Sequence, residues 1–240
     1  MGKTARQRWP GVWQGRHLRP DIPALPSGYR MLDQQLPSRG WPQGALTELL
    51  LGKPGSGELS LLLPALAKLT QQAQWVMMVD PPWIPYPPAL VEHGLDLERL
   101  LIIRTRSTKE SLWACEQALR GYRGGALLSW TDNPGFARLR RLHLAARSGH
   151  KLAFLFRPHT RAEQPSPAAL RLHVQADPNG CQIRVLKCQG HHPRSDILVR
   201  QPARLMSMTA SVPGAPVSRH AMPDPPHRKQ KTKRSQARPH

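Results

Sequence analysis

The sequence predicts an α/β protein: a mostly parallel sheet flanked by helices, with antiparallel strands toward its C-terminal end and flexible basic tails. One observation is that short, mostly apolar runs alternate with amphipathic segments between residues 45 and 156. Strands that are apolar on both faces are typical of a parallel sheet covered by helices on both sides. A second observation is the change after Pro165, where strand-like runs follow one another with only turn sequences between them.

The elements of the parallel part can be placed in order. The expected strands are the apolar runs at 45–51, 74–80, 99–104, 125–130 and 150–156. The expected helices span 57–72, 87–94, 108–121 and 135–149. Pro64 is expected to kink the first helix, because proline donates no backbone hydrogen bond. The last two helices are amphipathic, and we expect them to bury Leu112, Cys115, Ala118, Leu119, Leu139, Leu142 and Ala146.

Three further strands are expected after Pro165, with the sequences ALRLHVQAD, GCQIRVLKC and SDILVR. The turn sequences PNG and GHHPRS separate them. Short turns of this kind join antiparallel strands, so these runs predict an antiparallel extension of the sheet.

Charge divides the chain into three parts. The 240 residues carry a net charge of +20, with five basic residues and no acid in 1–20, and seven basic residues and one acid in 219–240. We expect a basic N-terminal arm at 1–25, an α/β domain at 26–207, and a disordered, proline-rich basic tail at 208–240. A charge this positive favours a polyanionic partner. Nucleic acid is favoured over a membrane surface or an acidic protein, although a contribution to solubility alone would also explain the charge.

Several protein classes are excluded by simple patterns. No apolar run reaches the roughly 18 residues of a membrane span, and the N-terminus has no apolar core of a secretory signal. Arg6 breaks the myristoylation pattern. Three cysteines suit a reducing cytoplasm, so we expect a cytoplasmic protein. Cys181 and Cys188 lie near His191 and His192, but their spacing does not fit a zinc site, and no metal is predicted.

The segment LGKPGSGELS resembles a nucleotide-binding loop. A P-loop has the pattern G-x-x-x-x-G-K-S/T between a strand and a helix. Gly52 and Gly57 have the required spacing, but Glu58 occupies the lysine position and Leu59 the hydroxyl position. The sequence therefore predicts a degenerate P-loop, formed by Gly52, Lys53, Pro54, Gly55, Ser56, Gly57, Glu58 and Leu59.

This loop keeps the shape of a phosphate site without its chemistry. Like charges about 4 Å apart repel by roughly 4 kcal/mol at an effective dielectric constant near 20, so Glu58 opposes a bound phosphate. Leu59 offers no oxygen to Mg²⁺. A displaced lysine, Lys53, would partly compensate under an alternative interpretation. Glu58 also has a simpler explanation, since an acid in the first turn of a helix suits the helix dipole.

The other parts of an ATPase are missing as well. The strand at 125–130 ends in Ser129 and Trp130 where a Walker B aspartate is needed, and Asp132 comes two residues late. Asp80 ends its strand but precedes PPW, so we expect it to cap or orient a turn rather than act as a base. No catalytic triad emerges, and no cofactor is predicted.

Three longer stretches carry a resemblance to a known family. LPSRGWPQGALTELLLGKPGSGELSLLLPALAKL, followed by WVMMVDPPWIPYPPALVEHGLDLERLLIIRT, resembles the RecA core in its order of turn, strand, P-loop and helix. Within that superfamily, LPSGYRMLDQQLPSRGWPQGALTEL, GLDLERLLIIR and FLFRPHTRAEQPSPAALRL resemble the ImuA family, which is related to the SulA division inhibitors. The resemblance runs from residue 25 to residue 200 and implies a RecA-like fold for 26–207.

The resemblance also transfers catalytic positions beyond the P-loop. The catalytic glutamate after the second strand falls near Pro82, and the Walker B aspartate falls at Ser129 or Trp130. The nucleotide-sensing glutamine falls near Arg157. Since every catalytic position departs from the family pattern, the fold does not imply ATP hydrolysis.

Three functions follow from this resemblance. The first is a non-catalytic scaffold of SOS-induced translesion synthesis, which bridges an ImuB-like Y-family protein, an error-prone polymerase, and DNA or RecA. The second is a SulA-type inhibitor that binds the tubulin-like division protein. The third is a residual ATPase or recombinase. A full RecA-like core with basic tails favours the scaffold, because a division inhibitor needs only a compact interaction domain.

The tails supply the remaining candidate residues. Trp9 and Trp13 lie among basic residues and suit partner anchors, although packing against the core would explain them equally well. DNA contacts are expected from the basic residues of the tail, Arg228, Lys229, Lys231, Lys233 and Arg234.

Overall fold

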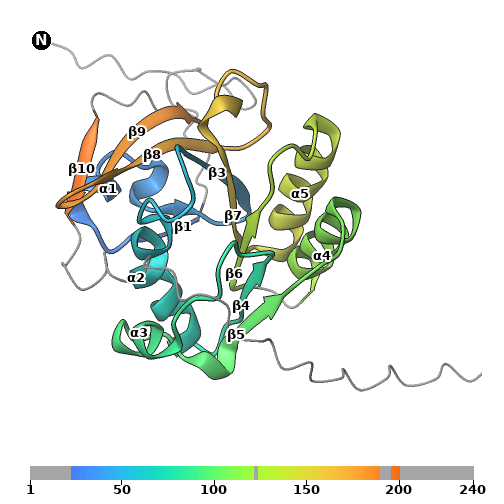
Figure 1. Ribbon diagram of the computed structural model, residues 1–240, viewed down its shortest axis with the longest axis horizontal. Coiled ribbons are helices and arrows are strands. Elements are labelled where there is room, and N and C mark those ends of the chain that lie inside the picture. The colour runs from blue at the N-terminus through green and yellow to red at the C-terminus, as the bar shows by residue number, and fades with distance from the viewer. Residues whose placement is uncertain (1–22, 122–123, 190–195, 201–240) are drawn as a thin grey trace, which may run out of the picture. The chain divides into compact units, whose positions relative to one another are not determined.

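The computed structural model describes residues 23–121, 124–189 and 196–200. They form an eight-stranded sheet with helices on both faces (Figure 1). The strand order is β10-β9-β8-β3-β7-β6-β4-β5. The strands are β3 (Ala45–Leu51), β4 (Val76–Val79), β5 (Leu100–Ile103), β6 (Ala126–Trp130), β7 (Leu152–Pro158), β8 (Leu170–Asp177), β9 (Gly180–Cys188) and β10 (Ile197–Arg200). The predicted α/β class with a mostly parallel sheet is therefore confirmed.

The parallel and antiparallel parts of the sheet meet at β8. β3 pairs in parallel with β7 on one side and with β8 on the other, whereas β9 and β10 pair antiparallel. The three strands expected after Pro165 thus pair antiparallel with one another, as predicted, and the extension joins the parallel part of the sheet through the parallel pairing of β8 with β3. The long connection between β7 and β8 explains this, because it carries the chain back to the edge of the sheet where β3 also begins.

Five α-helices are present in the described parts of the chain, and they divide between the two faces of the sheet (Figure 1). They are α1 (Arg30–Asp33), α2 (Glu58–Gln71), α3 (Pro87–Glu92), α4 (Thr108–Arg120) and α5 (Phe136–Gly149). Leucines of α1, α2 and α3 share one apolar core with the sheet, and α4 and α5 share the other. The predicted inward faces of α4 and α5 are buried as expected. None of these helices is long and apolar enough to cross a membrane.

Strand β3 lies at the centre and is buried along its whole length. Leu49 and Leu51 contribute to the core under α2, while Leu46 contributes to the core under α4 and α5. Full burial of such a side chain stabilises the fold by about 1.5–3 kcal/mol. The loop that follows β3 is therefore attached to a fully buried strand with a neighbour on each side.

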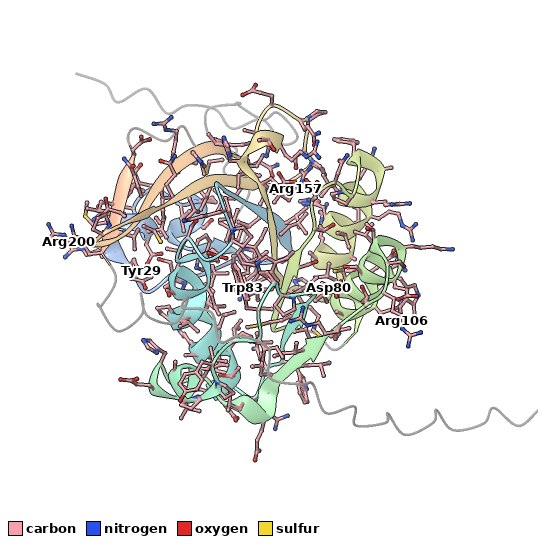
Figure 2. All side chains as sticks on the ribbon, viewed as in Figure 1. Tyr29, Asp80, Trp83, Arg106, Arg157 and Arg200 are labelled. Atoms are coloured by element: carbon pink, nitrogen blue, oxygen red, sulfur yellow. The ribbon has the colours of Figure 1, made fainter. Side chains whose placement is uncertain are left out.

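Pro64 lies within α2, and the helix continues across it. Proline has no N–H for the carbonyl of Ser60, four residues earlier. The hydroxyl of Tyr29 donates to that carbonyl at 3.2 Å, and Figure 2 shows Tyr29 beside this helix. Burial raises the pKa of Tyr29 to about 12, so the hydroxyl keeps its proton. Gly28 allows the close approach, since a Cβ there would lie 2.5 Å from Pro64 Cβ.

A short strand pair lies at the start of the described chain. β1 (Ala24–Leu25) pairs antiparallel with β2 (Trp41–Pro42). Leu25 is buried, and Trp41 packs edge-on against Phe154 with ring centroids 5.2 Å apart. The last residues assigned to the N-terminal arm thus belong to the folded part.

Candidate functional site

The degenerate P-loop lies between β3 and α2, at the carboxyl edge of the central strands. A cavity of about 240 Å³ opens beside it. The loop contributes Gly52, Lys53 and Pro54 to the wall, and the ends of β6 and β7 contribute Trp130 and Phe156. This edge is where open parallel sheets place ligands, so the loop occupies the expected position for a nucleotide site.

The loop backbone has the compact shape of a phosphate loop. Gly55 and Gly57 adopt positive φ values of 83° and 85°, which glycine tolerates best. The hydroxyl of Ser56 donates to the carbonyl of Lys53 at 2.6 Å and closes the turn. Cys181 in β9 donates its thiol to the Ser56 carbonyl at 3.1 Å and ties the loop to the sheet.

The side chain of Glu58 folds back into this loop. Its Oε1 accepts a hydrogen bond from the backbone N–H of Gly55 at 2.9 Å, and the residue is only 4% exposed. Burial raises the pKa of Glu58, and the neighbouring backbone N–H groups of Gly55 and Ser56 oppose that rise. These are the groups that would hold a phosphate in a working P-loop. The carboxyl group of Glu58 therefore occupies a place that a phosphate oxygen would take in a working loop.

The indole of Trp130, at the end of β6, lies near the carboxyl group of Glu58. It stacks on Phe156 with ring centroids 4.4 Å apart, and its N–H lies close enough to lower the pKa of Glu58 in part. Neither Trp130 Nε1 nor Glu58 Oε2 makes a hydrogen bond of standard geometry, although both atoms are buried. The contact between Trp130 and Glu58 is therefore weak. Glu58 Oε2 is buried without a hydrogen bond that would replace its contacts with water.

The other candidate residues of the nucleotide site differ in their burial and in their partners. Leu59 packs against the core under α2, and Lys53 is exposed at the cavity wall. Ser129 is buried and accepts a hydrogen bond from the thiol of Cys115 at 3.2 Å. Burial raises the pKa of Cys115 to about 11, which keeps this thiol protonated. Asp132, two residues beyond the end of β6, is exposed and pairs with Arg161 at 3.0 Å.

Asp80 orients a turn, as predicted. Its carboxylate accepts hydrogen bonds from the backbone N–H and the hydroxyl of Thr105, each at 2.7 Å. This fixes the chain where it leaves β5, and Asp80 itself takes a positive φ of 51°. No three His, Cys, Asp or Glu side chains gather as a metal site in the described ranges.

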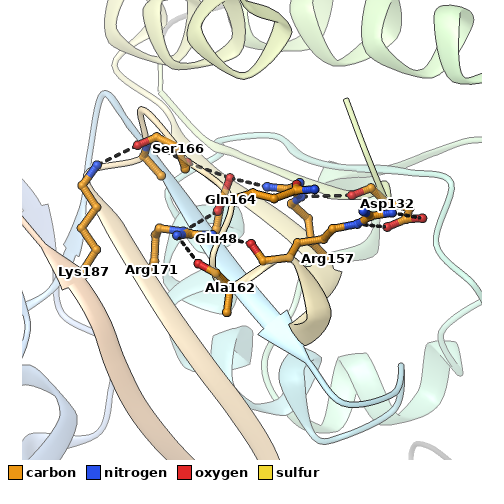
Figure 3. Close-up of polar contacts among 10 residues, drawn as sticks. Glu48, Asp132, Arg157, Ala162, Gln164, Ser166, Arg171 and Lys187 are labelled. Atoms are coloured by element: carbon orange, nitrogen blue, oxygen red, sulfur yellow. Dashed lines mark hydrogen bonds and ion pairs between the residues drawn. The ribbon is translucent and has the colours of Figure 1, made fainter. Parts of the chain in front are cut away.

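A buried cluster of charged residues, which no sequence motif indicates, lies on the strand that leads into the loop. Glu48, in the middle of β3, is fully buried and binds Arg157 at 3.1 Å and Arg171 at 2.7 Å (Figure 3). Arg157, the position expected for a nucleotide-sensing group, also donates to the backbone carbonyl of Asp132 and to Gln164. Its three donor nitrogens are thus engaged inside the protein. The available signal was an acid within the apolar run ALTELLL.

Known proteins similar to the chain are division inhibitors. No protein-family model matches the chain. The cell division inhibitor SulA of Klebsiella aerogenes is 31% identical over 116 residues, which are 47% of this chain and 69% of the relative. The chain belongs to the SulA family. SulA of Yersinia enterocolitica is 26% identical over 132 residues, 54% of this chain and 79% of that protein. SulA of Edwardsiella piscicida is 31% identical over 101 residues, 42% of this chain and 60% of that protein.

Membership of the SulA family confirms the broader part of the resemblance. These relatives are named SulA, so the narrower resemblance to ImuA stays a prediction. Several candidate residues of this SulA-family chain lie outside the described residues. They are Trp9, Trp13, His191, His192, Arg228, Lys229, Lys231, Lys233 and Arg234.

Proposed function

We propose that this SulA-family protein inhibits cell division during the SOS response by binding the tubulin-like division protein, without nucleotide turnover. The relatives at 26–31% identity are all cell division inhibitors by name, which supports the inhibitory role. The observation that carries the non-catalytic part is the Glu58 carboxylate, which accepts the Gly55 N–H inside the loop. A protein of this kind works through its surface, in the cytoplasm where the division protein assembles.

Electrostatics explains why the loop does not serve ATP. A phosphate would have to displace a buried carboxylate from the same N–H groups, and repulsion at about 4 Å costs roughly 4 kcal/mol at an effective dielectric constant near 20. The side chain of Lys53 is exposed at the wall of the cavity. It therefore does not take the place of the missing P-loop lysine beside the backbone N–H groups of the loop. The loop therefore lacks favourable contacts for the phosphates of ATP, whether or not catalytic groups are present.

The inhibitory role is tested with the purified protein and in cells. Controlled expression in the host bacterium should produce long filaments, and the purified chain should reduce sedimentation of the polymerised division protein. Glu58→Gln should inhibit as well as the wild type, since the loop takes no part. Normal cell length at high levels of the folded chain would reject division inhibition.

A second function, the translesion scaffold, is favoured by the extent of the fold. The chain carries elements from the P-loop strand through β10 in the order outlined for a RecA-like core. More than half of the chain lies outside the region aligned with the Klebsiella protein, which covers 47% of it. Such a scaffold would bridge an ImuB-like protein, an error-prone polymerase and RecA or DNA, with the basic tails near the DNA.

A deletion strain separates the two functions. After DNA damage, loss of filamentation with normal induced mutagenesis supports the division inhibitor. Loss of induced mutagenesis with normal filamentation and normal recombination supports the scaffold. Deleting the arm with Trp9 and Trp13 should weaken whichever partner binding is present.

A further inference from the structure

The two helical faces of the sheet differ in charge. On one face, α4 and α5 carry six basic side chains against two acidic ones: Lys109, Arg120, Arg138, Arg140, Arg141 and Arg147 against Glu110 and Glu116. On the other face, α1, α2 and α3 carry two basic and three acidic side chains: Arg30 and Lys68 against Asp33, Glu58 and Glu92. Among the helices of the described chain, the net positive charge therefore lies on α4 and α5.

A groove of about 310 Å³ runs between these two helices. Leu112 and Leu142 form its apolar floor, and Lys109 and Arg138 lie at its sides. Glu116 is the acid among the described lining residues, and it binds Arg141 at 2.6 Å and Arg120 at 2.8 Å. Its negative charge is thus compensated within the protein, and the groove presents a net positive surface.

Trp113 stands in this groove with 65% of its surface exposed. Helix α4 buries Leu112 and Cys115 toward the sheet, so the indole between them points outward by helical geometry. Lys109 precedes it by one turn on the same helix, and Arg138 lines the same groove from α5. An exposed aromatic ring between two cations is the arrangement that single-stranded nucleic acid uses for a stacked base and its flanking phosphates.

We propose that the α4–α5 groove binds single-stranded nucleic acid, with a base stacked on Trp113 and phosphates on Lys109 and Arg138. The arginines of α5 support this over an acidic peptide. α5 has four arginines and no acid. Arg138 and Arg141 line the groove, whereas Arg140 and Arg147 lie together on the outer side of the helix by their seven-residue spacing. A polyanion that runs out of the groove therefore meets further cations on α5, whereas an acidic peptide would anchor mainly in the apolar floor.

Binding is measured on the full chain by fluorescence anisotropy of a labelled oligothymidylate, over a range of salt concentrations. Trp113→Ala should weaken binding about five-fold or more, because stacking on an aromatic ring contributes about 1–3 kcal/mol per base. Arg138→Gln should weaken binding and reduce the magnitude of the salt slope by about 0.7, the value for one phosphate contact on a single strand. Binding should also quench tryptophan fluorescence in the wild type more than in Trp113→Ala.

Two matched controls separate this groove from the basic tails. Trp83→Ala removes another exposed tryptophan, 47% exposed, in the loop that leads to α3. Arg30→Gln makes the same charge change on α1 as Arg138→Gln makes on α5. Both controls should bind like the wild type. Equal affinities for Trp113→Ala and Trp83→Ala would overturn the proposal, as would polyglutamate binding with the same dependence on Trp113 and Arg138.

Discussion

The guanidinium of Arg157, in β7, lies 3.1 Å from the carboxylate of Glu48 in β3, and both side chains are buried. The same carboxylate binds Arg171 of β8 at 2.7 Å, so one acid joins three adjacent strands. Arg171 also donates to the backbone carbonyls of Arg161 and Ala162, which holds the crossing segment between β7 and β8 against the sheet. The cluster of Glu48, Arg157 and Arg171 thus stabilises the three central strands, and the degenerate P-loop follows one of them.

Glu48→Gln should destabilise the protein by about 3–5 kcal/mol, because it leaves two buried arginines without their counter-charge. The free energy of unfolding in urea measures this. Glu98→Gln is the control, since Glu98 is exposed, and it should change stability by less than about 0.5 kcal/mol.

An apolar replacement of the whole cluster tests whether the charges themselves stabilise the fold. A triple variant, Glu48→Leu with Arg157→Met and Arg171→Leu, should recover much of the stability lost in Glu48→Gln, because burying ions costs desolvation energy. A triple variant less stable than Glu48→Gln would show that the cluster holds the crossing segment through contacts that apolar side chains cannot replace.

Restoring the P-loop motif should restore binding of ATP but not its hydrolysis. Glu58→Lys with Leu59→Thr removes the internal carboxylate and supplies the missing lysine and hydroxyl. ATP with Mg²⁺ should raise the melting temperature of this variant and leave that of the wild type unchanged. Turnover should stay absent because Ser129 supplies no carboxylate. Hydrolysis by the wild type that disappears in Lys53→Ala would contradict this.

Glu58 should make stability depend on pH. Burial raises its pKa above the ordinary value of 4.5, so the folded state holds the proton more tightly than the unfolded state. Its contribution is then most favourable below pH 4.5 and is lost as pH rises through the folded pKa. Glu58→Gln lacks this titration, so its stability relative to wild type should improve with rising pH. Urea titrations across this range, with Glu98→Gln as a flat reference, measure the trend.

Two thiols should be unreactive in the native protein. Burial raises the pKa values of Cys115 and Cys188 to about 11 each, so thiolate is scarce near neutral pH. A chromogenic disulfide reagent should modify both slowly in buffer and rapidly in denaturant. Fast modification of Cys115 in the folded chain would show that α4 opens readily.

Most elements could be predicted from the sequence because the apolar runs are long and continuous. The run at 45–51 coincides with β3, and the helices at 108–121 and 135–149 match α4 and α5 within one residue at each end. The β1–β2 pair was missed because two-residue strands have no detectable periodicity. The parallel pairing of β8 with β3 could not be predicted. The turn sequence after β8 indicates that β9 is one neighbour in the sheet, but it does not indicate which strand is the other neighbour.

The site was predictable only in part. The mismatch at Glu58 is visible in the motif, but the return of its side chain to Gly55 depends on loop dihedral angles. Glu48 looks like an isolated acid until strand order brings it beside Arg157 and Arg171. The two arginines that bind Glu48 come 109 and 123 positions after it in the chain. Such pairings follow from the order of the strands in the sheet, which local sequence patterns do not reveal.

The central position of β3 also affects how the chain folds while it is being synthesised. The arginines that neutralise Glu48 come 109 and 123 residues later, on the two strands that flank β3. At about 5–20 residues per second, a ribosome needs roughly 5–25 seconds to produce them. During that delay the nascent chain displays an apolar strand with two open edges and an unmatched carboxylate. The nascent chain is therefore exposed to aggregation until β7 and β8 have been made and can cover both edges of β3.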